Sequence, residues 1–438
     1  MAEAIPKSVT RDLYDLLTGD EDARVCRDIP EVACREQPRN FFIHIISLVA
    51  SKTGDRLSSP KLVLSWLFTS LGAPTFMLGL LVPIRESLSL IPQLFVAGAI
   101  RSVGVRKWFW VTGSIVQGLS VIAMAVVALF LRGAAAGWSI LALLVVFSIA
   151  RGVCSVAAKD VLGKTISKSR RGTVTGYASS VAGAITIVVG LVALAMEPGK
   201  QDLGLFAGLL LIAGGLWIIG AFAFSRLEEH SGATEGGGNA ITEAVRQMHL
   251  IRDDSDLRQF LIVRTLLLST ALVAPFYVSI AAEHSGGALS QFGAMLVATG
   301  AASFLSAPAW GRMADRSSRR VMAVAALLAS IAGFLTAGLA QAPQLPYPAI
   351  AFASTYFLLN IAHAGVRVGR KTHLVDIATA ENRASYVAVS NTFIGMMLIA
   401  GGAFGGLASL AGSSAVILLL SALSLVAAGA AWRLKEAQ

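Results

Sequence analysis

Long apolar runs separated by short polar segments are the dominant pattern of this chain. A helix needs about 20 apolar residues to cross the hydrocarbon core of a bilayer, and twelve runs approach that length. We therefore predict an all-α polytopic membrane protein. The predicted spans lie near residues 62–82, 84–101, 108–131, 137–158, 173–196, 203–225, 258–282, 288–310, 321–341, 347–366, 385–409 and 412–433.

Two segments do not fit this pattern of spans. Residues 41–50 are apolar but too short to cross, so we expect a helix on the membrane surface or a plug against the inner face of the bundle. Residues 226–256 are polar and contain three consecutive glycines, which indicates a flexible linker. The predicted domains are a cytoplasmic leader with a short amphipathic segment (1–60), a six-helix bundle (61–225), a cytoplasmic linker (226–256), a second six-helix bundle (257–433) and a cytoplasmic tail (434–438).

The composition supports a membrane protein. Of the 438 residues, 55% are hydrophobic and 14% are charged, against about 25% charged residues in soluble domains. This excludes an ordinary soluble enzyme and also a disordered chain, which would be rich in charge. The three cysteines, Cys26, Cys34 and Cys154, show neither a disulfide framework nor the spacing of a metal site.

The basic residues are distributed unevenly between the two predicted sides of the membrane. With the N-terminus inside, 31 of the 36 lysines and arginines fall in inner segments, and the outer loops hold only Arg85, Arg132 and Lys200. Cytoplasmic loops carry such an excess, so both termini are predicted to be cytoplasmic. The formal net charge of +10 then reflects topology rather than nucleic-acid binding. No signal peptide is recognisable, and we expect a plasma-membrane protein, with a bacterial inner membrane as the expected location.

The second half of the chain repeats the first at a nearly constant separation of about half the chain length. A glycine and two basic residues after the second span recur after the eighth, and a position in the fourth span recurs in the tenth with almost the same shift. Six spans in each repeat make the halves parallel, and two parallel halves with a site between them are typical of a rocking transporter. The matched pairs are Gly98 and Gly311, Arg106 and Arg319, Lys107 and Arg320, and Arg151 and His363.

The loop after the eighth span reads Gly311-Arg312-Met313-Ala314-Asp315-Arg316-Ser317-Ser318-Arg319-Arg320. This segment resembles the Gly-x-x-x-Asp-Arg-x-x-Arg-Arg loop signature of the major facilitator superfamily, and span count, repeat and loop extend the resemblance over roughly residues 60–433. The resemblance implies that Asp315, Arg316, Arg319 and Arg320 form a cytoplasmic latch that favours the outward-open state. The copy in the first half has Ser102 in place of the aspartate, so only Gly98, Arg106 and Lys107 match there.

Ionisable side chains inside spans are the candidates for substrate binding and coupling, because a charge at membrane depth costs about 2.5–3.5 kcal/mol or more. The short first hairpin predicts one acidic and one basic residue in the outer half of the bundle. The fourth and tenth spans add a basic residue and a histidine at matching positions, with two polar neighbours within one helical turn. The candidate residues are Arg85, Glu86, Arg151, Asn360, His363 and Arg367.

A cavity with these basic residues and a single acid has a positive potential, which favours an anionic or zwitterionic cargo. We predict a secondary active transporter that moves a small organic solute by alternating access. Either Glu86 or His363 could carry a coupling proton, or no proton is coupled. The alternatives are multidrug-type efflux of lipophilic compounds and a non-transporting receptor or assembly factor.

We do not expect an enzyme, because phosphate-loop, zinc-protease and nucleophile-elbow motifs are absent from the sequence. We expect a monomer with a small-molecule substrate and membrane lipids as partners, and no cofactor, metal or nucleic acid.

Overall fold

The computed structural model describes residues 11, 14, 29–91, 100, 102–196, 203–232, 247–342, 345–379 and 383–436. These residues form helices joined by short turns. The helices of the first half are α2 (Glu31–Leu57), α3 (Val63–Ser70), η1 (Thr75–Met77), α4 (Leu78–Leu90), α6 (Lys107–Phe130), α7 (Gly133–Thr165), α8 (Lys168–Leu194) and α9 (Leu203–Ser225). Those of the second half are η2 (Gln247–His249), α11 (Leu250–Asp253), α12 (Ser255–Leu266), α13 (Ser269–Leu272), α14 (Ala274–His284), α15 (Leu289–Ala314), α16 (Ser318–Leu339), α17 (Pro348–Asp376), α18 (Arg383–Gly401) and α19 (Ala403–Trp432).

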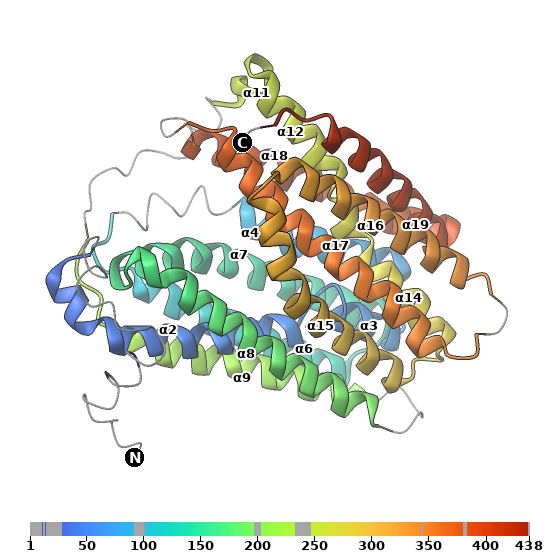
Figure 1. Ribbon diagram of the computed structural model, residues 1–438. Coiled ribbons are helices and arrows are strands. Elements are labelled where there is room, and N and C mark those ends of the chain that lie inside the picture. Colours follow the sequence, from blue (N-terminus) through green and yellow to red (C-terminus); the bar gives the residue numbers. More distant parts are fainter. Residues whose placement is uncertain are drawn as a thin grey trace.

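The helices form two bundles that follow the two halves of the chain. In Figure 1 the blue-to-green helices α2 and α6–α9 lie together, and the yellow-to-red helices α11, α12 and α16–α19 lie together above them. Nine helical segments of the described chain are long and apolar enough to cross a membrane, and the last of these contains both α18 and α19. Together with α2–α3 and α4, they are consistent with the predicted twelve crossings.

The first crossing differs from the prediction. Helix α2 packs along α8 and α9, and after a short break the chain continues as α3. The chain reverses at Gly72, whose φ of 67° suits glycine, before α4 begins. The predicted span 62–82 therefore contains a turn and is wrong. Residues 41–50 lie within the 27-residue helix α2 of the bundle rather than in a short helix of their own. The N-terminal bundle begins well before the predicted boundary at residue 61.

The cause of this error is the polarity of the first crossing helix. Lys52, Asp55 and Arg56 lie in α2, so its hydropathy is low, and the apolar run after Leu62 resembled a complete span. Arg85 lies in the interior of α4, within the bundle, as the short first hairpin predicts. Charged residues are tolerated in such a position when they face the interior of the bundle and pair with one another.

The eleventh and twelfth crossings meet inside α19 rather than between α18 and α19. Gly412 has φ 83° and ψ 160°, which breaks the helix between residues 403–411 and 413–432. This break agrees with the predicted spans 385–409 and 412–433. A side chain at Gly412 would be strained because only glycine adopts such a φ at no cost.

The two halves pack closely at the ends of the helices near the turn at Gly72. A Cβ atom added to Gly79 of α4 would lie 2.4 Å from Cα of Gly405, and one added to Gly293 of α15 would lie 2.3 Å from the backbone nitrogen of Leu194. The rings of Trp66 and Phe292 also meet across the halves, with centroids 5.6 Å apart. Small residues allow such close backbone approach between helices in a membrane.

The cysteines differ from the prediction in one respect. Cys154 is a buried free thiol, as expected, but Cys34 is disulfide-bonded, with its partner outside the described residues. The spacing of the cysteines gave no indication of this bond.

Candidate substrate-binding site

Asp55 is the centre of an ion-pair cluster inside the N-terminal bundle. Its carboxylate accepts hydrogen bonds from Arg85 of α4, at 3.0 Å, and pairs with Arg151 of α7. The two guanidinium groups also lie over aromatic rings, Arg85 at 4.9 Å from the centroid of Phe147 and Arg151 at 5.3 Å from that of Trp217. One carboxylate and two aromatic faces thus hold two of the predicted site residues.

Lys61 and His363 connect the two halves. The Lys61 ammonium lies 2.8 Å from Nε2 of His363, and Nδ1 of His363 lies 3.1 Å from the hydroxyl of Thr270. An ammonium group only donates, so Nε2 accepts and Nδ1 carries the ring proton, which it donates to Thr270. His363 is therefore a neutral hydrogen-bonding link in this conformation.

Tyr356 and Asn360 support this link from α17. The Tyr356 hydroxyl donates to the backbone oxygen of Lys61 at 3.1 Å, and the Asn360 amide donates to the backbone oxygen of Tyr356 at 2.8 Å. Asn360, predicted as a site residue, therefore bonds to its own helix one turn back, beside the Lys61 contact.

Four further cations near these pairs form no ion pair with a described carboxylate. Lys52 donates to Ser179 at 2.5 Å, and Arg56 donates to Thr186 at 3.5 Å. Arg367 is exposed and Arg370 is half-buried. No carboxylate of the described chain lies within 4.0 Å of Lys52, Arg56, Arg367 or Arg370.

Glu86 is the second acid of the site and lies among cations from both halves. The charges that act on its half-buried side chain are those of Lys61, Arg85, Arg370 and Arg367. The adjacent Arg85 binds Asp55, and Lys61 is the strongest of the charges that act on Glu86.

The repeat extends to this site. Arg264 of α12 follows Lys52 at the same separation that relates Arg151 to His363, and Asn391 of α18 follows Ser179 at that separation too. Lys52 donates to Ser179, and Arg264 donates to Asn391 at 3.1 Å and also to Ser390. In the first half, a basic side chain of α2 thus donates to α8, and in the second half a basic side chain of α12 donates to α18.

The predicted gating residues of the first half form a closed cluster. Arg106 donates to Asp160 at 2.5 Å, and the backbone N–H groups of Arg106 and Lys107, at the start of α6, donate to the fully buried Glu229. Lys164 bridges Asp160 and Glu229 at 3.1 and 3.0 Å. Acidic residues of α7 and of the segment after α9 therefore accept hydrogen bonds from this loop, although Ser102 replaces the family aspartate. The predicted Gly98 lies outside the described residues.

In the second half, an acidic residue near the C-terminus binds the corresponding loop. Glu436 accepts from the hydroxyl of Ser317 at 2.5 Å and pairs with Arg319 at 2.6 Å. These contacts hold the pKa of Glu436 below its usual value of 4.5. Asp315, Arg316 and Arg320 are exposed, and Gly311 has no neighbour where a side chain would begin.

The sequence model described as Major Facilitator Superfamily matches residues 260–438. This match covers the second half of the chain, and that half is similar to the superfamily whose loop signature the sequence contains. Among curated proteins, no sequence matches the chain significantly.

Solved structures of superfamily transporters share its fold. The nucleoside transporter NupG (D323A mutant) matches with a TM-score of 0.68 and 13% identity, covering 90% of this chain and 100% of that one. The inward-open xylose transporter XylE from E. coli matches with a TM-score of 0.63 and 14% identity, covering 90% and 96%. A POT family transporter in complex with 5-aminolevulinic acid matches with a TM-score of 0.67 and 11% identity, covering 89% and 94%. The chain thus shares the fold of these transporters.

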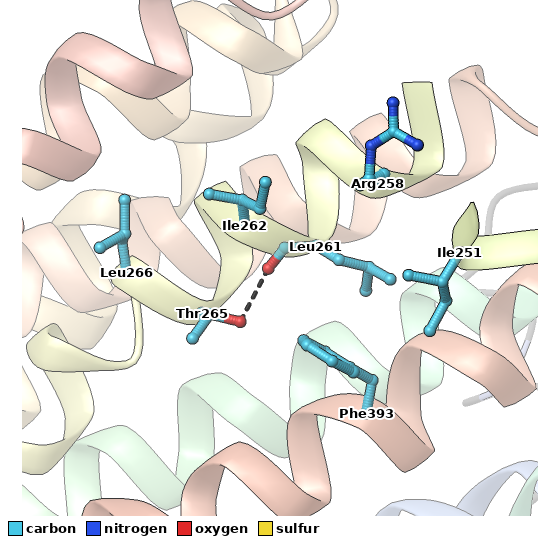
Figure 2. A pocket seen from close by; sticks show the side chains of 7 residues that line it. All are labelled: Ile251, Arg258, Leu261, Ile262, Thr265, Leu266 and Phe393. Carbon is cyan, nitrogen blue, oxygen red and sulfur yellow. Dashed lines mark hydrogen bonds between the residues drawn. The ribbon is translucent and has the colours of Figure 1, made fainter. Parts of the chain in front are cut away.

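An apolar pocket lies apart from the charged site. It has a volume of about 320 Å³ and lies between α11, α12 and α18, with Ile251, Leu261 and Phe393 among its lining residues (Figure 2). Arg258 stands at its edge and donates to the backbone oxygen of Arg252 at 2.9 Å. None of the predicted site residues lines it.

The sequence reasoning missed the residues of the first helix. The prediction places Lys52, Asp55 and Arg56 in a cytoplasmic leader that ends just before Lys61, so it does not include the acid that holds Arg85 and Arg151. One signal was present in the sequence, since Lys52 and Arg264 are related by the same repeat shift as Arg151 and His363.

Proposed function

We propose that this transporter moves a small organic anion across the plasma membrane by alternating access. One observation carries the proposal. Seven basic side chains surround the site, against two carboxylates, and both carboxylates already lie among cations. The basic residues are Lys52, Arg56, Lys61, Arg85, Arg151, Arg367 and Arg370. A positive site of this kind concentrates anions and excludes organic cations.

Different side chains are proposed for different tasks. Arg367 is exposed and has no carboxylate partner among the described residues, so it is the proposed first contact for the cargo. Arg151 and Arg85 would orient the cargo while they remain anchored to Asp55. The bond between Lys61 and His363 would hold the two halves in register.

The proposed orientation follows from the predicted excess of basic residues on the inner side. The closed end at Gly72, Gly79 and Gly405 would then face outward, and the cations of α2 and α17 would be reached from the cytoplasm. The inward-open XylE shares this fold, which supports an inward-facing assignment.

Thermal stability of the purified protein with succinate, inorganic phosphate, 5-aminolevulinic acid and tetraphenylphosphonium tests the proposal. A ligand at 100 times its Kd stabilises by about 2.7 kcal/mol, which is readily measured. We expect a shift with an anion and its loss in Arg367→Gln, with Arg258→Gln as the matched control. A shift with tetraphenylphosphonium alone would refute an anion site and favour drug efflux.

A zwitterionic cargo is the second candidate. The POT family transporter that shares this fold was solved with 5-aminolevulinic acid. In this chain Glu86 is the acid positioned to receive an ammonium group, beside Arg367 and Arg370 for the carboxylate. A shift with 5-aminolevulinic acid that disappears in Glu86→Gln, without a shift with succinate, would establish this candidate.

A further inference from the structure

Two short rows of cations face each other where the halves meet. One row is Lys52 and Arg56 on α2, and the other is Arg367 and Arg370 on α17. Lys61 and His363 touch across the interface. Arg56 lies five residues before Lys61 and Arg367 lies four residues after His363, on helices of opposite direction. Arg367 lies roughly 6 Å from His363 along α17, at about 1.5 Å per residue. Arg56 lies in the last turn of α2, before the break that leads to Lys61, so both arginines lie on the same side of the contact. Arg56 and Arg367 therefore belong to one level of the site.

The charges of the two rows act on each other. Arg367 is the strongest charge on Arg56, and it also acts on Lys52 and on Lys61. Among the described residues, Asp55 is the carboxylate whose charge acts on Arg56, and it is already paired with Arg85 and Arg151. The contacts of Lys52 and Arg56 with Ser179 and Thr186 satisfy hydrogen-bond donors but supply no negative charge.

Alternating access requires the halves to close on the side of these rows. In the present conformation Arg367 is exposed, so water weakens its repulsion from Arg56. Closure removes that water and brings the like charges closer, and a low dielectric strengthens repulsion as well as attraction. The halves therefore close readily only when a negatively charged group lies between the two rows of cations.

We propose that the anion supplies this negative charge, so that the empty protein does not close and the transporter works as an obligate exchanger of anions. This inference rests on the proposed function and adds its coupling mode. Inward movement of one anion is then tied to outward movement of another. The counter-substrate has the chemistry of the cargo, a small organic or inorganic anion able to lie between Arg56 and Arg367.

The first test is uptake of radiolabelled succinate, phosphate and 5-aminolevulinic acid into proteoliposomes. Vesicles are loaded either with the same unlabelled compound or with sucrose. We expect at least tenfold faster uptake in compound-loaded vesicles than in sucrose-loaded ones. Equal uptake by the wild type in both kinds of vesicle would overturn exchange while leaving anion transport intact. No uptake of any compound in either kind would instead count against the proposed function.

The second test needs no ligand and remains informative in that last case. Gly176 of α8 and Gly311 of α15 have no neighbours where a side chain would begin, so both accept spin labels as cysteine variants in a cysteine-free background. Without any organic anion we expect one long distance in the wild type. In Arg56→Gln/Arg367→Gln we expect a second, shorter distance, and in the control Arg252→Gln/Arg258→Gln none. A shorter population of equal size in the wild type would overturn the charge barrier.

Discussion

The Lys61 ammonium lies 2.8 Å from Nε2 of His363, and this bond joins the two halves of the protein at the level of their substrate site. It sits between the packed end near Gly72 and the cationic rows formed by Lys52 and Arg56 on one side and Arg367 and Arg370 on the other. The histidine in this bond is neutral, with its ring proton donated to Thr270. A basic residue and a histidine on opposite halves thus attract each other through a hydrogen bond, where two cations would repel.

Loss of the histidine acceptor should destabilise the protein. His363→Ala leaves the Lys61 ammonium without its partner, and an unsatisfied buried donor costs about 1–3 kcal/mol, more when charged. We expect a lower apparent Tm for His363→Ala. We expect a smaller decrease for Thr270→Val, which removes the hydrogen bond to Nδ1 of His363 but leaves the Lys61–His363 bond in place. Equal decreases for the two variants would show that Thr270, and not Lys61, is the important partner.

Asp55→Asn should destabilise the N-terminal bundle because it leaves Arg85 and Arg151 without their shared carboxylate. Breaking a fully buried pair costs about 3–5 kcal/mol. The Asp55 side chain is 20% exposed, so we expect about 1.5–3 kcal/mol, the range for a hydrogen bond to a charged group. Unfolding in detergent, followed by tryptophan fluorescence, measures the loss.

The matched control for Asp55→Asn is Glu31→Gln. The pair of Glu31 with Arg35 has a similar length of 2.7 Å, but its side chains are 80% and 76% exposed. Such surface pairs contribute about 0–1 kcal/mol, so this variant should unfold like the wild type. If the two variants lost the same stability, the buried cluster would have no special role.

The glycines at the packed end should be sensitive to a single methyl group. In Gly79→Ala the new Cβ would meet the backbone of Gly405 at 2.4 Å, and backbone cannot move aside as a flexible side chain can. We expect this end to open, which labels at Thr69 and Ser409 would report as a longer distance. Gly208→Ala on α9 has free space and should leave that distance unchanged.

Glu436 should stabilise the C-terminal bundle except in acid. Its pKa is lowered in the folded protein by the hydrogen bond from Ser317 and by Arg319, so its stabilising effect is present above its unfolded pKa near 4.5. The effect is lost as the pH falls through the still lower folded pKa. The difference in Tm between the wild type and Glu436→Gln should be constant from pH 8 to 6 and shrink below about pH 4.5. A difference that shrinks already between pH 8 and 6 would contradict the lowered pKa.

The later spans could be predicted because their signal is local. Helices such as α6, α9 and α16 are apolar over a full membrane thickness, and a count along the chain finds them. The first crossing could not be predicted in this way. Lys52, Asp55 and Arg56 are stable at membrane depth only because helices α4, α7 and α8 bring Arg85, Arg151, Ser179 and Thr186 to them.

Composition, spacing and hydropathy are properties of the chain alone, so they predict the membrane class, the twofold repeat, the loop signature and several charged candidates. The pairing of these charges depends on how the helices pack: Asp55 pairs with Arg85 and Arg151, Lys61 bonds to His363, and Glu229 and Glu436 accept hydrogen bonds from the two loops. These partners lie from 30 to 302 residues apart along the chain. A charge selects its partner by distance in space and by the local dielectric, and helix packing sets both.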